Sequence, residues 1–158
     1  MKSTGEAIGY DNKLNRALYK ALQASGMHLQ NYGTVFATIA DKDKDEALPL
    51  IKRFYNLGFN IEATEGTALY LKENGIRTRM LRKISEGSHE ILDSIHQGHM
   101  AYVLNTKDIG SFGQESDGHK IRRSATENNV TMLTSLDTVR VLLDVLEEMT
   151  LTISTIDA

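Results

Sequence analysis

The sequence contains no cysteine, and this absence excludes several kinds of chemistry. A chain without thiols has no disulfides, cysteine-ligated zinc, iron–sulfur clusters or thiol nucleophiles. It suits a reducing compartment, so we expect a cytoplasmic protein. The 158 residues still suffice for one globular domain that buries roughly 68–70% of the surface of the unfolded chain. Neither a disulfide nor a structural metal is therefore needed for folding.

Long apolar runs and an excess of basic residues are also missing. No run approaches the roughly 20 apolar residues that a membrane helix needs, and no apolar stretch follows Lys2 as in a secretory signal. The 18 lysines and arginines are outnumbered by 21 aspartates and glutamates, which gives a net charge of −3. We therefore expect neither a membrane nor a nucleic acid as a partner, and any anion site must be local.

Short runs rich in β-branched residues alternate with helical stretches along the chain. We predict strands at 34–40, 60–64, 78–83, 100–104 and 130–133, and helices at 45–57, 67–73, 89–97, 120–129 and 136–149. Strands that alternate with helices form a parallel sheet covered on both faces. The predicted fold is therefore a three-layer α/β sandwich with a five-stranded parallel sheet, Rossmann-like or flavodoxin-like.

The two ends of the chain differ from this pattern. Residues 1–30 are predicted to form a linker and a leading helix, residues 31–150 the α/β domain, and residues 151–158 a C-terminal tail. The glycine-rich segment 108–119 is predicted to be a mobile loop.

Polar side chains follow each predicted strand. Ligands of parallel α/β sheets bind outside the carboxyl ends of the strands. Cations, hydroxyls and an amide are placed there, and they come from the segments 41–44, 64–67, 82–83, 105–107 and 134–135. Their common placement predicts a local anion site, although a single lysine such as Lys44 or Lys83 would be an ordinary solvated side chain.

The segment from Thr64 to Thr67 is the sharpest of these features. It places two hydroxyls and the small Gly66 at a strand-to-helix turn, where free backbone N–H groups and the positive end of the helix favour phosphate or carboxylate. The same Thr-x-x-Thr pattern also serves as a simple helix cap. Both interpretations remain open from the sequence.

Histidines near the third predicted helix form a weaker pattern. His89, His96 and His99 lie close to Asp93 and could resemble metal ligands. His99 falls beyond the helix stop at Gly98, and exposed histidines on a helix explain the pattern as well. We expect no metal site.

The absence of several well-known motifs excludes further functions. No Gly-x-Gly-x-x-Gly motif, Walker loop or nucleophile elbow is present, which argues against dinucleotide binding, nucleoside-triphosphate hydrolysis and α/β-hydrolase chemistry. Lys120, Arg122 and Arg123 could clamp an anion or line a solvated helix face.

Five blocks occur in an order and at a spacing that resemble one known family. The blocks are Ala40 to Lys44, Ala63 to Ala68, Lys83 to Gly87, Asn105-Thr106 and Ile121 to Ala125. They resemble the methylglyoxal-synthase-like domain at the C-terminal end of the carbamoyl-phosphate synthase large chain, and Lys2 to Glu6 is similar to the segment that leaves its second ATP-grasp half. The resemblance spans nearly the whole sequence and implies that the chain is a fragment of that large chain.

The resemblance implies regulation rather than catalysis. In this family the domain binds a nucleotide effector, with UMP expected here and IMP or phosphoribosyl pyrophosphate as alternatives, and it shifts the activity of distant synthetase sites. The domain itself needs no cofactor, whereas the parent enzyme uses ATP with Mg or Mn to make carbamoyl phosphate for pyrimidine and arginine synthesis. The implied partners are the rest of the large chain and the glutaminase small chain. An isolated fragment is also expected to self-associate through its leading helix or its tail.

The resemblance also assigns residues, and it assigns no catalytic one. The effector phosphate would meet Lys44, Thr64, Gly66, Thr67 and Lys83. Asn105, Thr106 and Lys107 would lie nearer the ribose or base. Further candidate contacts are Arg122, Arg123 and Thr134, of which Thr134 matches a position that contacts ornithine in some members. Lys107 stands where enteric relatives have a hydroxyl, so the sequence leaves the identity of the effector open.

Two enzyme classes with the same fold are alternatives. Methylglyoxal synthase removes phosphate from dihydroxyacetone phosphate with a carboxylate base, but Ser85 to His89 stands where its Gly-Gly-Asp-Gln-Gln block belongs. Glu86 or Asp93 would have to replace that aspartate. The cyclohydrolase domain of purine synthesis carries a lysine- and histidine-bearing block after the third strand, and this sequence lacks it.

Overall fold

The computed structural model describes residues 20, 29–84, 87–106 and 117–157, and it contains the predicted parallel sheet. The strands are β1 (Thr34–Thr38), β2 (Asn60–Thr64), β3 (Thr78–Leu81), β4 (Met100–Asn105) and β5 (Thr131–Leu133). Their order is β3-β2-β1-β4-β5, and every neighbouring pair is parallel. The order reverses direction between β1 and β4, where ligands of such sheets bind.

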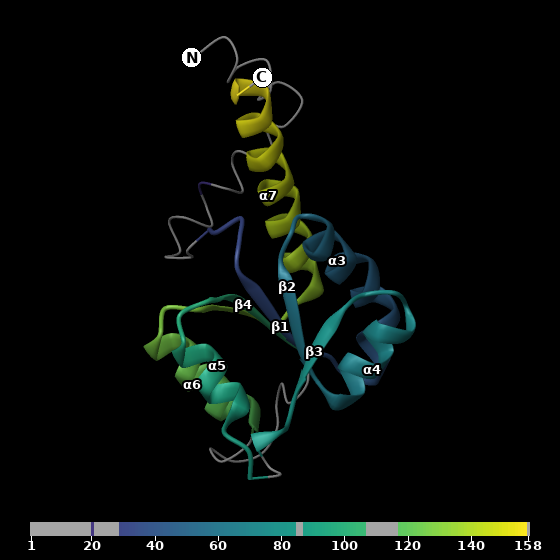
Figure 1. Cartoon of the computed structure of the whole chain (residues 1–158), viewed down its shortest axis with the longest axis vertical. Helices are drawn as coiled ribbons and strands as arrows, with labels where there is room; N and C mark the ends of the chain where they lie inside the picture. Colours follow the sequence, from purple (N-terminus) through teal and green to yellow (C-terminus); the bar gives the residue numbers. More distant parts are fainter. Residues whose placement is uncertain (1–19, 21–28, 85–86, 107–116, 158) are drawn as a thin grey trace.

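Helices cover both faces of the sheet, so the predicted three-layer α/β fold is confirmed (Figure 1). The helical elements are the 3-10 turn η1 (Asp41–Asp43), α3 (Lys44–Asn56), α4 (Glu65–Glu73), α5 (Glu90–His96), α6 (Asp117–Glu127) and α7 (Leu136–Asp157). One buried cluster lies beneath α3, α4 and α7, and a second lies beneath α5 and α6. Successive residues of a strand point to opposite faces. Val35 and Ala37 therefore enter the first cluster, whereas Phe36 enters the second.

The predicted end of the last helix is wrong. Helix α7 continues past Met149 to Asp157, so residues 151–157 prolong the helix rather than form a separate tail. Figure 1 shows the C-terminal half of α7 extending beyond the sheet. No glycine or proline follows Met149, and the threonines and isoleucines of this segment lower helix propensity only slightly. Nothing in the chain therefore ends the helix earlier.

Other predicted boundaries differ by smaller amounts. Strand β1 ends at Thr38, and β3 ends at Leu81, whereas α6 begins at Asp117, inside the segment predicted to be a loop. Pro49 is the sixth residue of α3 and lies on its exposed side. The predicted leading helix falls almost entirely outside the described residues.

None of the helices in the described part of the chain is both long and apolar enough to span a membrane.

Candidate functional site

Three polar residues form a row across the carboxyl ends of neighbouring strands. Thr64 ends β2, Thr38 ends β1 and Asn105 ends β4, and all three are buried. The Thr64 hydroxyl donates to the Thr38 hydroxyl at 3.3 Å, and Thr38 is in register with Asn105. By strand alternation the row lies on the face that α5 and α6 cover. The structure therefore brings Thr64 and Asn105 to one edge, as predicted.

Lys44 and Gly66 meet at the same edge. Helix α4 begins directly after β2, and α3 follows β1 after a single 3-10 turn. The Lys44 ammonium lies 3.5 Å from the position that a Cβ on Gly66 would occupy, and it pairs with Asp41 Oδ1 at 2.5 Å. The first N–H groups of a helix lack intrahelical partners and attract anions. A cation held beside the first turn of α4 adds to that attraction.

The hydroxyls of Thr67 and Thr106 are oriented by the segment that follows β1. Thr67 Oγ1 accepts the Ile39 N–H at 3.1 Å, and Thr106 Oγ1 accepts the Ala40 N–H at 2.9 Å. Each hydroxyl also carries a proton. The hydroxyls can still donate this proton; Thr106 is half-buried, whereas Thr67 is 1% exposed.

The helix-cap interpretation of the Thr-x-x-Thr segment does not fit the geometry. Thr64 is the N-cap residue of α4, but its side chain makes no capping hydrogen bond and donates to Thr38 instead. Thr67 links α4 to Ile39 and is 1% exposed. These threonines therefore join the β2–α4 turn to the end of β1.

Asn105 has an unsatisfied buried acceptor. The residue is 3% exposed, and its Oδ1 finds no hydrogen-bond partner among the described residues. A buried acceptor without a partner costs about 1–3 kcal/mol, and such atoms are rare in folded proteins. A ligand that donates an N–H or O–H to Oδ1 would remove this penalty.

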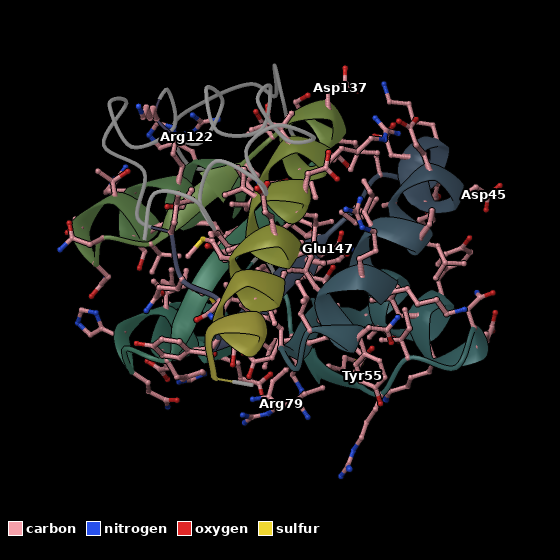
Figure 2. All side chains as sticks on the ribbon, turned by 90° about the horizontal axis from the view of Figure 1, so that it is seen from above. Asp45, Tyr55, Arg79, Arg122, Asp137 and Glu147 are labelled. Atoms are coloured by element: carbon pink, nitrogen blue, oxygen red, sulfur yellow. The ribbon has the colours of Figure 1, made fainter. Side chains whose placement is uncertain are left out.

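The remaining predicted site residues make fewer contacts with the strand-end residues around Lys44. Lys83 is half-buried and lies two residues beyond the end of β3. Arg122 and Arg123 are exposed on α6, and within the described residues no hydrogen bond or ion pair joins them to Lys44. Figure 2 shows Arg122 at the edge of the molecule. Lys107 lies outside the described residues.

Thr134 lines a separate cleft beside this edge. The cleft has a volume of about 790 Å³ and lies between η1 and the start of α7. Thr106 borders it as well, so the cleft adjoins the row of strand-end residues. Acidic side chains dominate its lining, as Asp41, Asp43 and Asp137 illustrate.

The histidines do not assemble around a common point. His96 Nδ1 lies 3.0 Å from Asn128 Oδ1, whereas His99 lies near Glu62. Over 29–84, 87–106 and the part that begins at 117, no group of three potential metal-ligating side chains is found.

Sequence reasoning missed two residues at this edge. Thr38 was placed inside a strand predicted to run to residue 40, so its position at the strand end was hidden. The alternation of side chains along a strand could have indicated its position, because it predicts that Thr38 and Phe36 point to the same face of the sheet. Asp41 was recognised only as part of the segment that follows the strand, although it is the partner of Lys44.

Comparisons with known proteins give the family. A model of the MGS-like domain matches residues 46–134, which is more than half of the chain. The chain is also similar in structure to a methylglyoxal synthase from Elizabethkingia anophelis NUHP1, with a TM-score of 0.57 and 18% sequence identity over 73% of this chain and 79% of that one. At this identity the likeness concerns the fold alone. From the family match, we conclude that the chain belongs to the MGS-like domain family.

Proposed function

We propose that the carboxyl edge of the sheet binds the phosphate of a nucleotide without transforming it, as the regulatory domain of a carbamoyl-phosphate synthase large chain. The observation that carries this proposal is the Lys44 ammonium beside Gly66 at the start of α4. UMP is the effector we favour, with IMP or phosphoribosyl pyrophosphate as alternatives.

The donors at this edge suffice for useful affinity. The phosphate would take charge-assisted bonds from Lys44 and Lys83, and hydrogen bonds from Thr67 and the first N–H groups of α4. A hydrogen bond to a charged group contributes about 1.5–3 kcal/mol. Three such bonds approach the roughly 8 kcal/mol that corresponds to micromolar binding.

A nucleotide fits better than inorganic phosphate because of Asn105. Its Oδ1 has no partner among the described residues and needs a donor, and a nucleotide supplies several donors besides its phosphate group. Ribose hydroxyls and the N–H of a pyrimidine do offer one. The Thr106 hydroxyl, oriented by Ala40, would donate to an acceptor on the same part of the ligand.

The proposal extends to the parent enzyme. Effector binding would alter contacts between this domain and the rest of the large chain, since allostery requires two states with different effector affinity. ATP with Mg or Mn would be used by other domains, and the glutaminase small chain would be a further partner. The cytoplasm is the proposed location.

Calorimetric titration with UMP tests the proposal. We expect Lys83→Ala to weaken UMP binding by about 10- to 100-fold, which corresponds to about 1.4–2.8 kcal/mol. Lys72→Ala removes an exposed lysine at the far end of α4 and should leave the affinity unchanged. Wild-type affinity in the Lys83 variant would contradict the assignment. Parallel titrations with IMP, phosphoribosyl pyrophosphate and inorganic phosphate identify the effector.

Methylglyoxal synthase activity is the competing function, favoured by the likeness to a solved methylglyoxal synthase. It would need a carboxylate base. Asp93 is exposed on α5, and Glu86 lies outside the described residues. The carboxylate beside Lys44 is that of Asp41.

An assay with dihydroxyacetone phosphate separates the two functions. We expect no methylglyoxal above a protein-free control. Formation of methylglyoxal that is lost in Asp41→Asn would establish the lyase instead and identify its base.

A further inference from the structure

A second cleft lies at the opposite edge of the sheet. It has a volume of about 500 Å³ and is lined by residues at the amino ends of the strands and at the end of α3, among them Tyr55, Glu62, Arg77, Arg79 and His99. Figure 2 shows Tyr55 and Arg79 at one edge of the molecule and Arg122 and Asp137 at the other. We call it the amino-edge cleft. Its volume lies within the roughly 300–1,000 Å³ of small-molecule sites.

The amino-edge cleft contains a buried carboxylate. Glu62 is 4% exposed and lies in the middle of β2. It is in register with Phe36, which belongs to the apolar cluster on that face of the sheet. A carboxylate at such a position is costly unless it is paired and hydrogen-bonded. A leucine or valine would pack there without that cost.

The two oxygens of Glu62 have unequal partners. Oε1 accepts a hydrogen bond of 2.6 Å from the Ser94 hydroxyl. Oε2 lies 3.5 Å from Arg79 Nη1 and 3.8 Å from His99 Nε2. The Arg79 side chain is 69% exposed and that of His99 is 38% exposed. Both partners face solvent, so a positively charged ligand group could compete with them for Oε2.

The cluster is not arranged for nucleophilic catalysis. A relay needs the serine on one nitrogen of the histidine and the carboxylate on the other. Here Ser94 Oγ and Glu62 Oε2 both approach Nε2 of His99, at 3.3 and 3.8 Å. Ser94 is also 4% exposed. The arrangement therefore favours binding over group transfer.

Arg77 supplies a charge of the opposite sign at the rim. It is exposed, and it forms no ion pair within the part of the chain that the structure describes. Arg79 is in register with Glu62, and Arg77 precedes Arg79 by two residues, which places it roughly 7 Å nearer the amino end of the strand. Extended side chains and a small ligand can bridge that separation. The ring of Tyr55 adds an aromatic wall that suits an ammonium group.

We propose that the amino-edge cleft binds an α-amino acid, whose ammonium group meets Glu62 and whose carboxylate meets Arg77. The cleft offers one buried carboxylate and, at Arg77, one guanidinium without an ion pair among the described residues, and a small zwitterion is their complement. This site is separate from the nucleotide site at the carboxyl edge and does not depend on it.

Amide shifts in NMR spectra of the ¹⁵N-labelled chain test this proposal. Each standard L-amino acid is titrated in turn, with methylammonium and acetate as probes that carry one charged group each. We expect at least one amino acid to give saturable shifts at Glu62 and its strand neighbours, and neither single-charge probe to saturate over the same range. If no amino acid gives saturable shifts at the cleft, the proposal is wrong.

Two variants make the result specific. Glu62→Gln keeps an acceptor for Ser94, and Arg77→Ala removes an exposed side chain; each is expected to weaken amino-acid binding at least about tenfold. Lys72→Ala is the matched control and should bind like the wild type. If Glu62→Gln fails to fold, Arg77→Ala alone decides, and unchanged affinity in that variant overturns the proposal. UMP titration of Arg77→Ala should be unaffected, which separates failure here from failure of the nucleotide site.

Discussion

The ammonium group of Lys44 lies 3.5 Å from the point where a Cβ on Gly66 would stand. The absence of a side chain at Gly66 keeps open the space between that charge and the first turn of α4. An anion in this space would contact the Lys44 ammonium, which also pairs with Asp41, and the first backbone N–H groups of the helix. Glycine at this position is therefore explained by access to the helix start rather than by backbone conformation, because its φ lies outside the left-handed region.

Gly66→Ala should separate stability from binding. Alanine is favoured over glycine in a helix by up to about 1 kcal/mol, and the new Cβ would make only an ordinary contact with Lys44. We expect a free energy of unfolding that is unchanged or about 0.5 kcal/mol higher. UMP affinity should fall about tenfold because the methyl group occupies the space over the N–H groups. Urea unfolding and calorimetry measure the two effects, and unaltered UMP affinity would show that the phosphate binds elsewhere.

Thr67 should tolerate serine but not valine. Its hydroxyl accepts the Ile39 N–H across 28 residues of sequence, and the residue is 1% exposed. Thr67→Val has the same shape but leaves that buried N–H unpaired, so we expect a loss of about 1–3 kcal/mol in the free energy of unfolding. Thr67→Ser keeps the acceptor and should lose less. Equal stability of the two variants in urea unfolding would contradict this role of the hydroxyl.

Asn105→Val should stabilise the ligand-free protein. Valine suits a strand, and it removes a buried acceptor that has no partner among the described residues. We expect the free energy of unfolding to rise by about 1 kcal/mol. The same change should weaken UMP binding about tenfold or more, since the ligand loses an acceptor. A variant that is destabilised and binds UMP normally would show that Asn105 is a structural residue.

The fold could be predicted from the sequence because the central strands β1 and β4 are buried along their whole length and form continuous apolar runs. Strand β2 begins and ends where the pattern of apolar residues predicted, at Asn60 and Thr64. The end of α7 was not readable, because no local signal distinguishes a helix that continues to Asp157 from one that ends at Met149. Boundaries without glycine or proline depend on packing, which a single sequence does not record.

The candidate site could be predicted only in part from the sequence. The topology rule that ligands bind at the carboxyl ends of strands places Lys44, Thr64 and Asn105 at one edge, and the structure bears this out. Their partners were not predictable, since Thr67 meets Ile39 and Thr106 meets Ala40 across long sequence separations. The amino-edge cleft was missed for the same reason. The sequence indicates only that Glu62 lies in a strand. Its hydrogen bond with Ser94, 32 residues away, is visible only in the structure.

Arg53 should be sensitive to replacement by lysine. From α3 its guanidinium donates to Glu147 at 2.9 and 2.6 Å and to Asp144 at 2.7 Å, both on α7. The hydrogen bond to Glu147 is the main cause of a pKa well above the usual value for arginine. Lysine keeps the charge but cannot make the forked contact. Because the group is partly solvated and screened, we expect Arg53→Lys to lose about 1 kcal/mol in urea unfolding. A loss that does not shrink in high salt would argue against an electrostatic origin.

Tyr102 should make the folded protein less stable at alkaline pH. Its ring packs near Phe54 and Phe59, and its hydroxyl donates to the Gln30 carbonyl and accepts the Gln30 N–H. Burial raises its pKa to about 12, although the backbone hydrogen bond from Gln30 acts in the opposite direction. The unfolded chain loses this proton near about pH 10. Between these values the unfolded state binds fewer protons than the folded state, so stability falls as the pH rises.

The size of this alkaline loss can be tested with Tyr102→Phe. The difference between about 10 and about 12 corresponds to a loss of about 3 kcal/mol. Phenylalanine cannot ionise, so the variant should lose less stability over that range than the wild type, although it starts about 1 kcal/mol lower without the two bonds to Gln30. Tyr32→Phe, at a residue that is 67% exposed, controls for the other tyrosines. Urea midpoints measured from neutral to alkaline pH decide the matter, and parallel declines in wild type and Tyr102→Phe would show that this hydroxyl does not set the limit.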